Sequence, residues 1–316
     1  MIMSPADIPV LLLTYKRVDS VVTLIDLLRV IGTKNIYFAN NAPRNSKEKE
    51  ITDEVRSLKS LIDWDCSVVE FFKITHLDVK HSIVSSIDQF FENVEFGIIL
   101  EDDCIPSRDF FQYVADTYNQ CYSNNYPIFI SGDNFDELTT YRKARLSKYC
   151  HIWGWASNRS LWTYYDKDLL RLTDFSTVYN WFFSNNRFNF KERIYWYGIL
   201  LNVKYNFIVT WDYQLIFTMW ENNLYSILPN SNLVHNIGFN SDATNTNSSK
   251  SSHYTNEIGN YVPVNLSILE YEPFYDRLIS KRHYQITLFN STYLFFKSAV
   301  KVLLLLIFKF RISYKK

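Results

Sequence analysis

Three acidic residues follow one another directly after an apolar run. Glu101, Asp102 and Asp103 stand within the stretch GIILEDDCIP, residues 97–106. Adjacent carboxylates repel one another, and each also loses hydration if the strand ends in a cleft. A hard divalent cation such as Mg²⁺ or Mn²⁺ would offset that cost, because it takes oxygen ligands and keeps waters and substrate phosphates. A solvated turn in which Asp103 or Ser107 caps the next helix is the alternative interpretation.

The elements that lead up to this acidic triplet (Glu101, Asp102 and Asp103) alternate between strand and helix. Apolar runs predict strands at 8–17, 35–41, 66–73 and 96–100, and amphipathic spacing predicts helices at 19–32, 46–62 and 82–94. Such alternation predicts an α/β fold with an open, mostly parallel central sheet flanked by helices. The triplet then lies just beyond the carboxyl end of its strand, where such sheets bind ligands. This position favours the metal site over the solvated turn.

The second half of the chain is less regular. PIFISG, residues 127–132, predicts another strand, and residues 151–162 are rich in aromatic side chains. Residues 206–223 begin with a strand-like pattern and become helical near Asp212. Residues 233–256 begin apolar and continue as a tract of Asn, Ser and Thr, which predicts a mobile loop.

Composition and charge exclude several classes of protein. The 316 residues are 47% hydrophobic and 21% charged, which is typical of one large or two small globular domains. Lys plus Arg and Asp plus Glu each number 33, so no overall positive field attracts nucleic acid. The four cysteines form no CxxC pair, which argues against a zinc site or a disulfide framework and favours a reducing cytosol. The N-terminal apolar run is short and lacks a preceding basic region, so we expect a strand and no signal peptide there.

The C-terminal stretch 294–316 is apolar but carries regularly spaced lysines. Lys297, Lys301 and Lys309 are four and eight residues apart and share one helical face. The seven uncharged residues between Lys301 and Lys309 are far fewer than the ~20 needed to span a bilayer. The pattern predicts a basic amphipathic helix at 294–312 that lies in a membrane interface. The alternative is a terminal helix that docks on the core or on a second subunit.

The stretch GIILEDDCIPSRDFFQY, residues 97–113, resembles the acidic motif of GT-A nucleotide-sugar glycosyltransferases. It is most similar to the family that includes the N-acetylglucosaminyltransferase initiating complex N-glycans, and it also resembles bacterial nucleotide-diphospho-sugar transferases of surface polysaccharide synthesis. Further matching stretches follow in the family's order, at residues 9–19, 36–44, 152–162, 210–214 and 233–244. The resemblance implies a GT-A fold over residues 1–260. It divides that domain into a nucleotide-binding half (about 8–110) and a sugar and acceptor half (about 111–260), followed by a C-terminal helical extension, 261–316, which the resemblance does not cover.

The resemblance implies a set of donor contacts in the first half of the chain. Thr14 and Arg17 match the place that holds nucleotide, and Arg17 matches a phosphate-contacting arginine, a task that suits a guanidinium. Asn41, or Asn40, stands where the family usually carries an acidic residue that contacts the base. An amide can still bond a pyrimidine edge, so the nucleotide is expected to be UDP but is left open. Asp103 matches the direct metal ligand.

The resemblance also implies roles for other acidic residues of the chain. Asp102 and Glu101 are expected to hold ribose or metal-bound waters, with Asp102 also a candidate metal ligand. Asp212 in TWDYQ matches the catalytic base, which in an inverting transferase takes the acceptor hydroxyl proton. Glu221 is the second choice for the base. Without the resemblance, Asp212 would be interpreted as a helix N-cap.

The aromatic stretch and the late loop complete the implied site. Trp153, Gly154 and Trp155 match a turn beneath the sugar, where Gly permits close backbone approach and a Trp face packs on a pyranose. Two core tryptophans are the alternative. His235 is a candidate for pyrophosphate or metal contact, although a lone His is more often a hydrogen-bonded structural residue. The polar tract after it suits a lid that excludes water from the donor.

These observations predict an inverting, Mn²⁺- or Mg²⁺-dependent glycosyltransferase. It would move a sugar from a nucleotide-diphospho-sugar, for example UDP-GlcNAc, to a hydroxyl of a lipid-linked or surface glycan. Its expected place is cytoplasmic, peripherally bound to the inner face of a bacterial cytoplasmic membrane, without nucleic acid as a partner. Two alternatives remain: a nucleotidyltransferase that makes the sugar nucleotide, and an inactive glycan- or membrane-binding protein of the same fold. The Gly-free stretch LLLTYKRVD counts against the first, because such enzymes usually carry a Gly-rich phosphate loop there.

Overall fold

The structure is a computed structural model that describes residues 2–121, 127–134, 143–172, 178–179, 181–182, 187–238, 258–263 and 265–313. The strands are β1 (Val10–Thr14), β2 (Asn35–Asn40), β3 (Ser67–Phe72), β4 (Phe96–Glu101), β5 (Cys104–Pro106), β6 (Phe129–Ser131), β7 (Arg145–Ser147), β8 (Trp155–Asn158), β9 (Ser226–Leu228) and β10 (Val234–Asn236). Within the described residues they form one eight-stranded sheet, in the order β3-β2-β1-β4-β8-β6-β9-β7, and one two-stranded sheet of β10 and β5.

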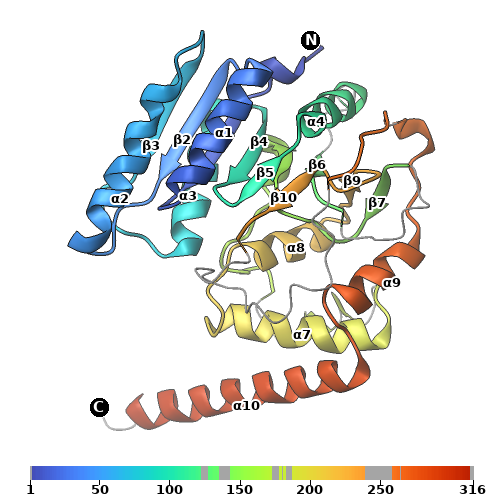
Figure 1. Cartoon of the computed structure of the whole chain (residues 1–316). Coiled ribbons are helices and arrows are strands. Elements are labelled where there is room, and N and C mark those ends of the chain that lie inside the picture. The colour runs from blue at the N-terminus through green and yellow to red at the C-terminus, as the bar shows by residue number, and fades with distance from the viewer. Residues whose placement is uncertain are drawn as a thin grey trace.

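Helices cover both faces of the larger sheet (Figure 1). The α-helices described are α1 (Val18–Ile31), α2 (Ser46–Ser57), α3 (Val79–Asn93), α4 (Arg108–Cys121), α5 (Arg159–Trp162), α7 (Phe190–Lys204), α8 (Asp212–Glu221), α9 (Pro273–Arg282) and α10 (Leu288–Ser313). Short 3₁₀ turns are η1 (Pro5–Asp7), η2 (Leu58–Leu61) and η5 (Leu266–Ile268). The chain is therefore a mixed α/β protein with a large central sheet between layers of helices, as the sequence predicts.

The first half follows the predicted alternation closely. β1 pairs in parallel with β2 on one side and with β4 on the other, and β2 pairs in parallel with β3. Local signals set the helix ends: Gly32 ends α1 with φ 73°, and the side chains of Asn45 and Asp78 cap the first turns of α2 and α3. Because all four strands are parallel, their carboxyl ends meet at one edge of the sheet.

The second half turns the sheet into a mixed one. β8 is antiparallel to both β4 and β6, β6 is parallel to β9, and β7 pairs antiparallel with β9. The helix expected near Asp212 is confirmed as α8, but the strand-like start of the stretch 206–223 is wrong, because residues 206–210 are not in a strand. The sequence also gives no warning of α7. Its buried positions include Trp196, Gly198 and Leu200, which lie all round the helix, so no amphipathic stripe marks it.

The side chains of β1 show why the sheet is buried on both faces. Val10 and Leu12 pack with α1 and α4 on one face, whereas Leu11 and Leu13 pack with α3, α7 and α8 on the other. Successive residues of a strand point to opposite faces, so a strand covered on both sides reads as one apolar run. This explains the unbroken LLL of the first predicted strand.

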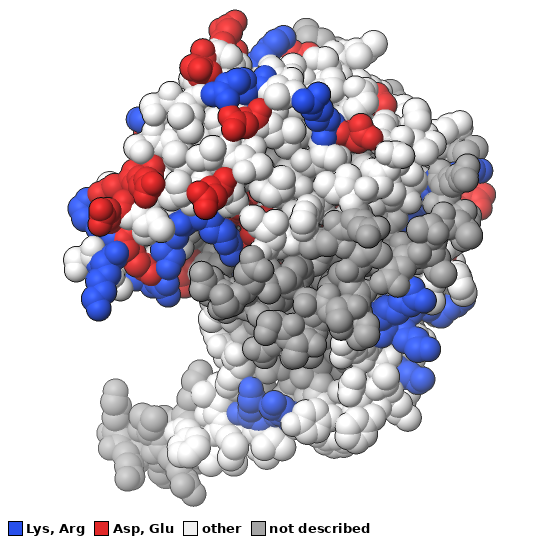
Figure 2. All heavy atoms as spheres, viewed as in Figure 1, with Lys and Arg blue, Asp and Glu red and all other residues white. Residues whose placement is uncertain are grey.

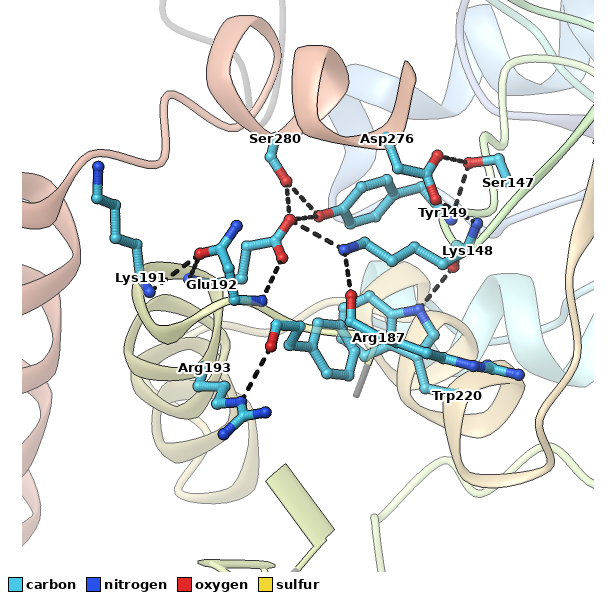
Figure 3. A network of polar contacts seen from close by, with 12 residues as sticks. Ser147, Lys148, Tyr149, Arg187, Lys191, Glu192, Arg193, Trp220, Asp276 and Ser280 are labelled. Carbon is cyan, nitrogen blue, oxygen red and sulfur yellow. Dashed lines mark hydrogen bonds and ion pairs between the residues drawn. The ribbon is translucent and has the colours of Figure 1, made fainter. Parts of the chain in front are cut away.

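A buried polar network attaches α9 to the sheet and to α7 (Figure 3). Lys148 Nζ lies 2.9 Å from the Glu192 carboxylate at the start of α7, and Ser280 of α9 donates to the same carboxylate. Asp276 of α9 accepts bonds from the Ser147 hydroxyl and the Lys148 amide, at 2.6 and 2.9 Å. The C-terminal segment thus packs against the elements that precede it. The predicted domain boundary at residue 260 stays a prediction.

The last helix, α10, is longer than predicted. It begins at Leu288 instead of residue 294 and lies alongside α7 (Figure 1). By length and composition, Leu288–Phe308 is the one helix in the described part of the chain that can cross a membrane. The segment therefore has the length and mean hydropathy of a span although it carries Lys297 and Lys301, so its short uncharged stretch does not by itself exclude one. The interface helix stays a prediction.

Two glycines permit a close crossing of backbone segments at the end of β6. The amide of Gly132 donates to the carbonyl of Gly154 at 2.7 Å, and Gly154 adopts φ 66°. A Cβ on Gly132 would lie 2.6 Å from the Gly154 oxygen and from Val234 of β10. The crossing therefore joins β6, the turn before β8, and β10, and it accepts no side chain at residue 132.

Gly132→Ala should destabilise the protein more than a glycine substitution that meets only conformational strain. We expect a loss of about 3 kcal/mol in the free energy of unfolding, the upper range for overpacking, because backbone and packed side chains surround the new methyl group. Gly32→Ala is the control: it has a left-handed φ of 73° but no atom within 4 Å of its Cβ. It should cost about 1 kcal/mol. Urea unfolding of both variants measures the difference, and equal losses would contradict the close crossing.

Candidate functional site

The acidic triplet lies at the carboxyl edge of the parallel strands, held by Arg17. The Asp102 amide bonds the Leu13 carbonyl at 3.0 Å, which ties the end of β4 to the end of β1. Arg17, at the start of α1, forms an ion pair with Asp102 and lies 3.2 Å from Asp103. The Tyr15 amide donates to the second Asp102 oxygen at 2.8 Å. Both oxygens of Asp102 are therefore engaged within the protein.

Burial strongly perturbs the triplet. It raises the pKa of Glu101 well above its usual value, and the neighbouring charges of Asp103, Asp102 and Asp212 raise it further. Burial also raises the pKa of Asp102 to about 6, although Arg17 acts in the opposite direction. The site thus holds more acid than its one arginine compensates, which is the expected state of a site that takes a cationic or proton-bearing ligand.

Asp212, far from the triplet in the sequence, belongs to the same electrostatic group. It contributes to the raised pKa of Glu101, and burial raises its own pKa above the usual value. Its carboxylate accepts a bond from the Thr210 hydroxyl and one from the Tyr213 amide. It is the first residue of α8, whose N-cap is Trp211, so the N-cap interpretation misses by one position. The fold therefore brings the predicted base toward the predicted metal site.

Glu221, the second choice for the base, lies elsewhere. It is the last residue of α8, and nine residues of helix separate it from Asp212 by about 13 Å. Burial raises its pKa, and the charges that act on it come from Arg171 and Asp166, not from the triplet. Its placement at the opposite end of α8 leaves Asp212 as the candidate.

Thr14 and Asn41 use their polar atoms to join strand ends and loops. The Thr14 hydroxyl donates to the Ala39 carbonyl at 2.8 Å. The Asn41 side chain accepts from the amides of Ala42 and Leu77 at 2.9 and 3.1 Å, and it donates to the Leu77 carbonyl at 2.8 Å. Asn40, the alternative, bonds Thr14 and Arg56. Contacts of Thr14 and Asn41 with a nucleotide remain predictions.

The structure corrects the prediction for Trp155. This side chain is fully buried, stacked on Phe129 and Trp211 with ring centroids 5.0 and 6.0 Å apart. It lies in the core and has no exposed face for a sugar. The Trp155 ring packs on Trp211, the residue directly before Asp212, so Trp155 can affect the site through this packing contact. Trp153 is half-buried and stays a candidate for a sugar contact.

Gly154 is needed, but for a contact within the protein. A Cβ there would lie 2.9 Å from Val234 of β10 and 3.3 Å from Leu100 of β4. The close approach that the sequence predicts is therefore made to β10 and β4. An approach to a sugar remains a prediction.

β10 passes beside the triplet, but His235 points away from its buried side. Val234 and Asn236 are buried and His235 between them is exposed, as alternation in a strand requires. The amide of Ile237 donates to the Asp103 carbonyl at 2.8 Å. The pyrophosphate or metal contact of His235 stays a prediction. The predicted lid, residues 239–256, lies outside the described residues.

Sequence reasoning missed two features of this edge. A Cβ on Gly238 would lie 2.4 Å from an Asp103 carboxylate oxygen, so a larger residue there would displace that carboxylate. Asp133 lies fully buried, and one of its carboxylate oxygens is 3.4 Å from Nδ1 of the His151 ring. The sequence did hold a signal for Asp133, since this acid directly follows the predicted strand 127–132. No sequence signal distinguished Gly238 from an ordinary loop glycine.

The donor set fits a hard cation only in part. Among the described residues no three His, Cys, Asp or Glu side chains converge as a metal site. Asp102 is the poorer candidate ligand, because it is buried and each of its oxygens already bonds Arg17 or the Tyr15 amide. Asp103 fits better: its carboxylate is partly exposed and its 3.2 Å contact with Arg17 leaves oxygen lone pairs for a metal. A cation here would need waters and substrate phosphates as its other ligands, as Mg²⁺ commonly has.

Comparisons with known proteins give only distant likenesses. No family model matches the chain, and no curated protein sequence matches it. Among solved structures, the UTP-bound UGPase from Acinetobacter baumannii is similar over 70% of this chain and 85% of its own, with 6% identity and a TM-score of 0.37. HddC from Yersinia pseudotuberculosis, complexed with GMP-PN, is similar over 49% and 78%, with 10% identity and a TM-score of 0.32.

A third structure, a UDP-glucose pyrophosphorylase complexed with UDP-glucose, is similar over 50% of this chain and 78% of its own. Its identity is 12% and its TM-score 0.31. TM-scores below 0.5 carry no argument about the activity of this chain, so its function has to be argued from the site.

Asp102→Asn should stabilise the protein at pH 8 and not at pH 4. The rise of the Asp102 pKa from 3.8 to about 6 corresponds to about 3 kcal/mol of stability, lost as the pH rises from 3.8 through 6 and the buried acid ionises. An asparagine avoids this loss, and its oxygen can still accept from the Tyr15 amide. Denaturant unfolding at both pH values measures the effect.

The exposed Asp65→Asn is the control and should change stability by less than about 0.5 kcal/mol at either pH. If Asp102→Asn is less stable than the wild type at pH 8, the ion pair with Arg17 outweighs the cost of burial and the electrostatic description is wrong.

Proposed function

We propose that the protein binds a nucleotide-diphospho-sugar at the carboxyl edge of β1 and β4 and transfers the sugar to an acceptor hydroxyl. The observation that carries the proposal is the grouping of Arg17 with the acidic triplet at one edge of the sheet, together with the effect of the Asp212 charge on the pKa of Glu101. An arginine and an oxygen ligand for a cation suit a diphosphate, and a separate half-buried carboxylate suits a base. UDP is the expected nucleotide.

The leaving group is held on the triplet side of the site. Arg17 is half-buried and already faces two carboxylates, so an incoming diphosphate competes with Asp102 and Asp103 for its guanidinium. Asp103 would hold a Mn²⁺ or Mg²⁺ ion together with the donor phosphates. When bound, such an ion stabilises the negative charge that grows on the leaving diphosphate.

The proton is taken on the other side, by Asp212. The acceptor oxygen forms a bond to the anomeric carbon, the bond from that carbon to the diphosphate breaks, and the hydroxyl proton passes to the Asp212 carboxylate. A base with a raised pKa holds such a proton more readily at neutral pH, and burial supplies that rise here. The Thr210 hydroxyl and the Tyr213 amide orient the carboxylate. An attack from the face opposite the leaving group inverts the anomeric centre.

The acceptor is expected to be a lipid-linked or surface glycan in bacterial polysaccharide or lipopolysaccharide synthesis. A lipid-linked acceptor would be met at the inner face of the cytoplasmic membrane, with α10 as the element that brings the enzyme there. A nucleotidyltransferase that makes the sugar nucleotide is the second candidate. Two of the similar structures are a UGPase and a UDP-glucose pyrophosphorylase, but their TM-scores are too low to carry an argument for this chain. The Gly-free loop after β1 counts against it.

The product distinguishes the candidates. Incubation with UDP-GlcNAc, Mn²⁺ and a lipid-linked or soluble glycan acceptor should release UDP, whereas a nucleotidyltransferase given sugar 1-phosphate and UTP should release pyrophosphate. Asp103→Ala should abolish the metal-dependent part of donor binding measured by calorimetry. Donor affinity that is unchanged in this variant contradicts the ligand assignment, and a wild type that binds no nucleotide sugar refutes the enzyme proposal.

Asp212→Asn should keep donor binding and lose transfer. Removing a general base typically costs 10²–10⁴-fold in rate. In the wild type, transfer should fall as the pH falls through the Asp212 pKa, and this acid limb should lie above the usual value of 3.8 because burial raises that pKa. Glu221→Gln is the matched control and should retain the rate. Steady-state transfer across pH, with donor affinity measured separately, checks both variants; near-normal turnover of Asp212→Asn removes it as the base.

A further inference from the structure

The outer side of α10 is an exposed apolar stripe. Its members follow one another at intervals of three or four residues, so they lie on one side of the helix. They are Phe289, Tyr293, Phe296, Val300, Leu303 and Ile307, each 41–77% exposed. A water-soluble surface helix turns such a face toward the core, and here it faces away from the protein.

The side of α10 that faces the protein combines small polar groups with apolar ones, and Leu294 and Phe295 pack there. Ser291 and Ser298 are buried, and the Asn202 side chain of α7 donates to Ser298. Gly198 of α7 lets the helices approach closely, since a Cβ there would lie 3.1 Å from Leu294 and 3.3 Å from the Phe295 backbone. The helix is therefore attached to α7 through small, polar and apolar groups, and the apolar stripe is a further apolar side that stays exposed.

The far end of α10 has no support beneath it in the described structure. The helix runs on beyond the end of α7 toward the C terminus (Figure 1). Leu304, Leu306 and Phe308 are exposed there together with Leu303 and Ile307, so apolar side chains point to several sides. An exposed apolar surface of this extent marks a contact with another apolar phase.

The C-terminal region from residue 277 onward carries charge of one sign, because its charged side chains are all basic. Residues 277–316 contain nine Lys or Arg and no Asp or Glu, which leaves 24 basic against 33 acidic residues in the first 276. Figure 2 shows blue side chains over the α9 and α10 region of this face and no red ones there. A groove of about 290 Å³ beside the start of α10 is lined by Lys191, Arg277 and Lys281. The acid in its lining, Glu192, turns its carboxylate to Lys148 (Figure 3).

We propose that α10 lies in the surface of an anionic lipid leaflet, with its apolar stripe among the acyl chains and the basic groups of α9 and α10 at the lipid phosphates. The inference rests on the membrane association in the proposed function and deepens it by naming the contact face and the lipid charge. Lys297 and Lys301 flank the stripe and can reach the headgroups along their apolar stems. A second copy of this chain is disfavoured as the occupant, because two such faces would bring like charges together.

The attachment to α7 determines how the helix meets the bilayer. The first turns of α10 are bonded to α7, and α7 is itself fixed by the buried pair of Glu192 and Lys148. For α10 to cross the bilayer, it would have to leave α7 and expose Ser291 and Ser298 to lipid. The helix therefore lies along the leaflet, although its length also permits a span.

Vesicle binding of the full-length chain tests the proposal. The protein should sediment with phosphatidylcholine vesicles that contain a quarter phosphatidylglycerol, and raising the salt concentration should weaken this binding. Phe296→Ser with Leu303→Ser should lower the partition coefficient by about a hundredfold, because two large apolar side chains no longer insert. Lys297→Glu with Lys301→Glu should remove the preference for the anionic lipid. Ile74→Ser, at an apolar side chain that is 97% exposed far from α10 in the sequence, is the matched control and should bind as the wild type does.

Four results would overturn the proposal. The first is equal binding to vesicles that lack phosphatidylglycerol, and the second is wild-type binding by the Phe296 and Leu303 double variant. The third is retention of the protein in membranes at pH 11, which indicates a span. The fourth is a wild type that does not bind vesicles but forms a dimer, which the double variant does not form. Donor affinity of the double variant, measured without vesicles, should equal that of the wild type. A wild type that binds vesicles but no nucleotide sugar refutes the proposed function and leaves the lipid contact intact.

Discussion

The ion pair of Arg17 with Asp102 and Asp103 is the contact on which the site depends. Three neighbouring carboxylates lie at the end of β4, with Asp102 buried and the other two half-buried, and the pKa values of Glu101 and Asp102 are raised although Arg17 opposes the rise. β1 supplies the arginine because it pairs in parallel with β4, so both strands end at the same edge. The incomplete balance makes this edge receptive to a ligand that brings positive charge, and the arginine makes it receptive to phosphate.

The second half of the chain supplies the base through packing, not through charge. Trp155 of β8 stacks on Trp211, which directly precedes Asp212. β8 is held between β4 and β6, and the backbone crossing of Gly132 with Gly154 connects this part of the sheet to β10. Trp155, which the sequence places beneath the sugar, thus supports the predicted base Asp212 instead. The two groups of the proposed reaction thus come from different halves of the chain: the leaving group is held at the end of β4 and the proton acceptor is at the start of α8.

The C-terminal region holds α10 on the protein and is separate from the candidate site. The buried network around Glu192 and Lys148 joins α7 and α9 to β7, and it provides a firm base for α10. α10 then presents an apolar face that the protein itself does not cover. Nothing in this arrangement requires the helix to touch the candidate site, so the binding of a surface and the binding of a donor are separable properties of the chain.

Local patterns in the sequence determined the first half of the fold almost completely. The apolar runs of β1, β2 and β4, the spacing of α1 to α3 and the capping residues Asn45 and Asp78 act within a few residues, so they are visible without a structure. They also placed the acidic triplet at a strand end and Lys297 and Lys301 on a helix. Only the tertiary structure decided that Trp155 lies in the core, that both oxygens of Asp102 are engaged, and that α10 turns its apolar side outward. Each of these depends on partners distant in sequence, such as Trp211, Arg17 and α7, and the face a side chain presents is decided by what packs against it.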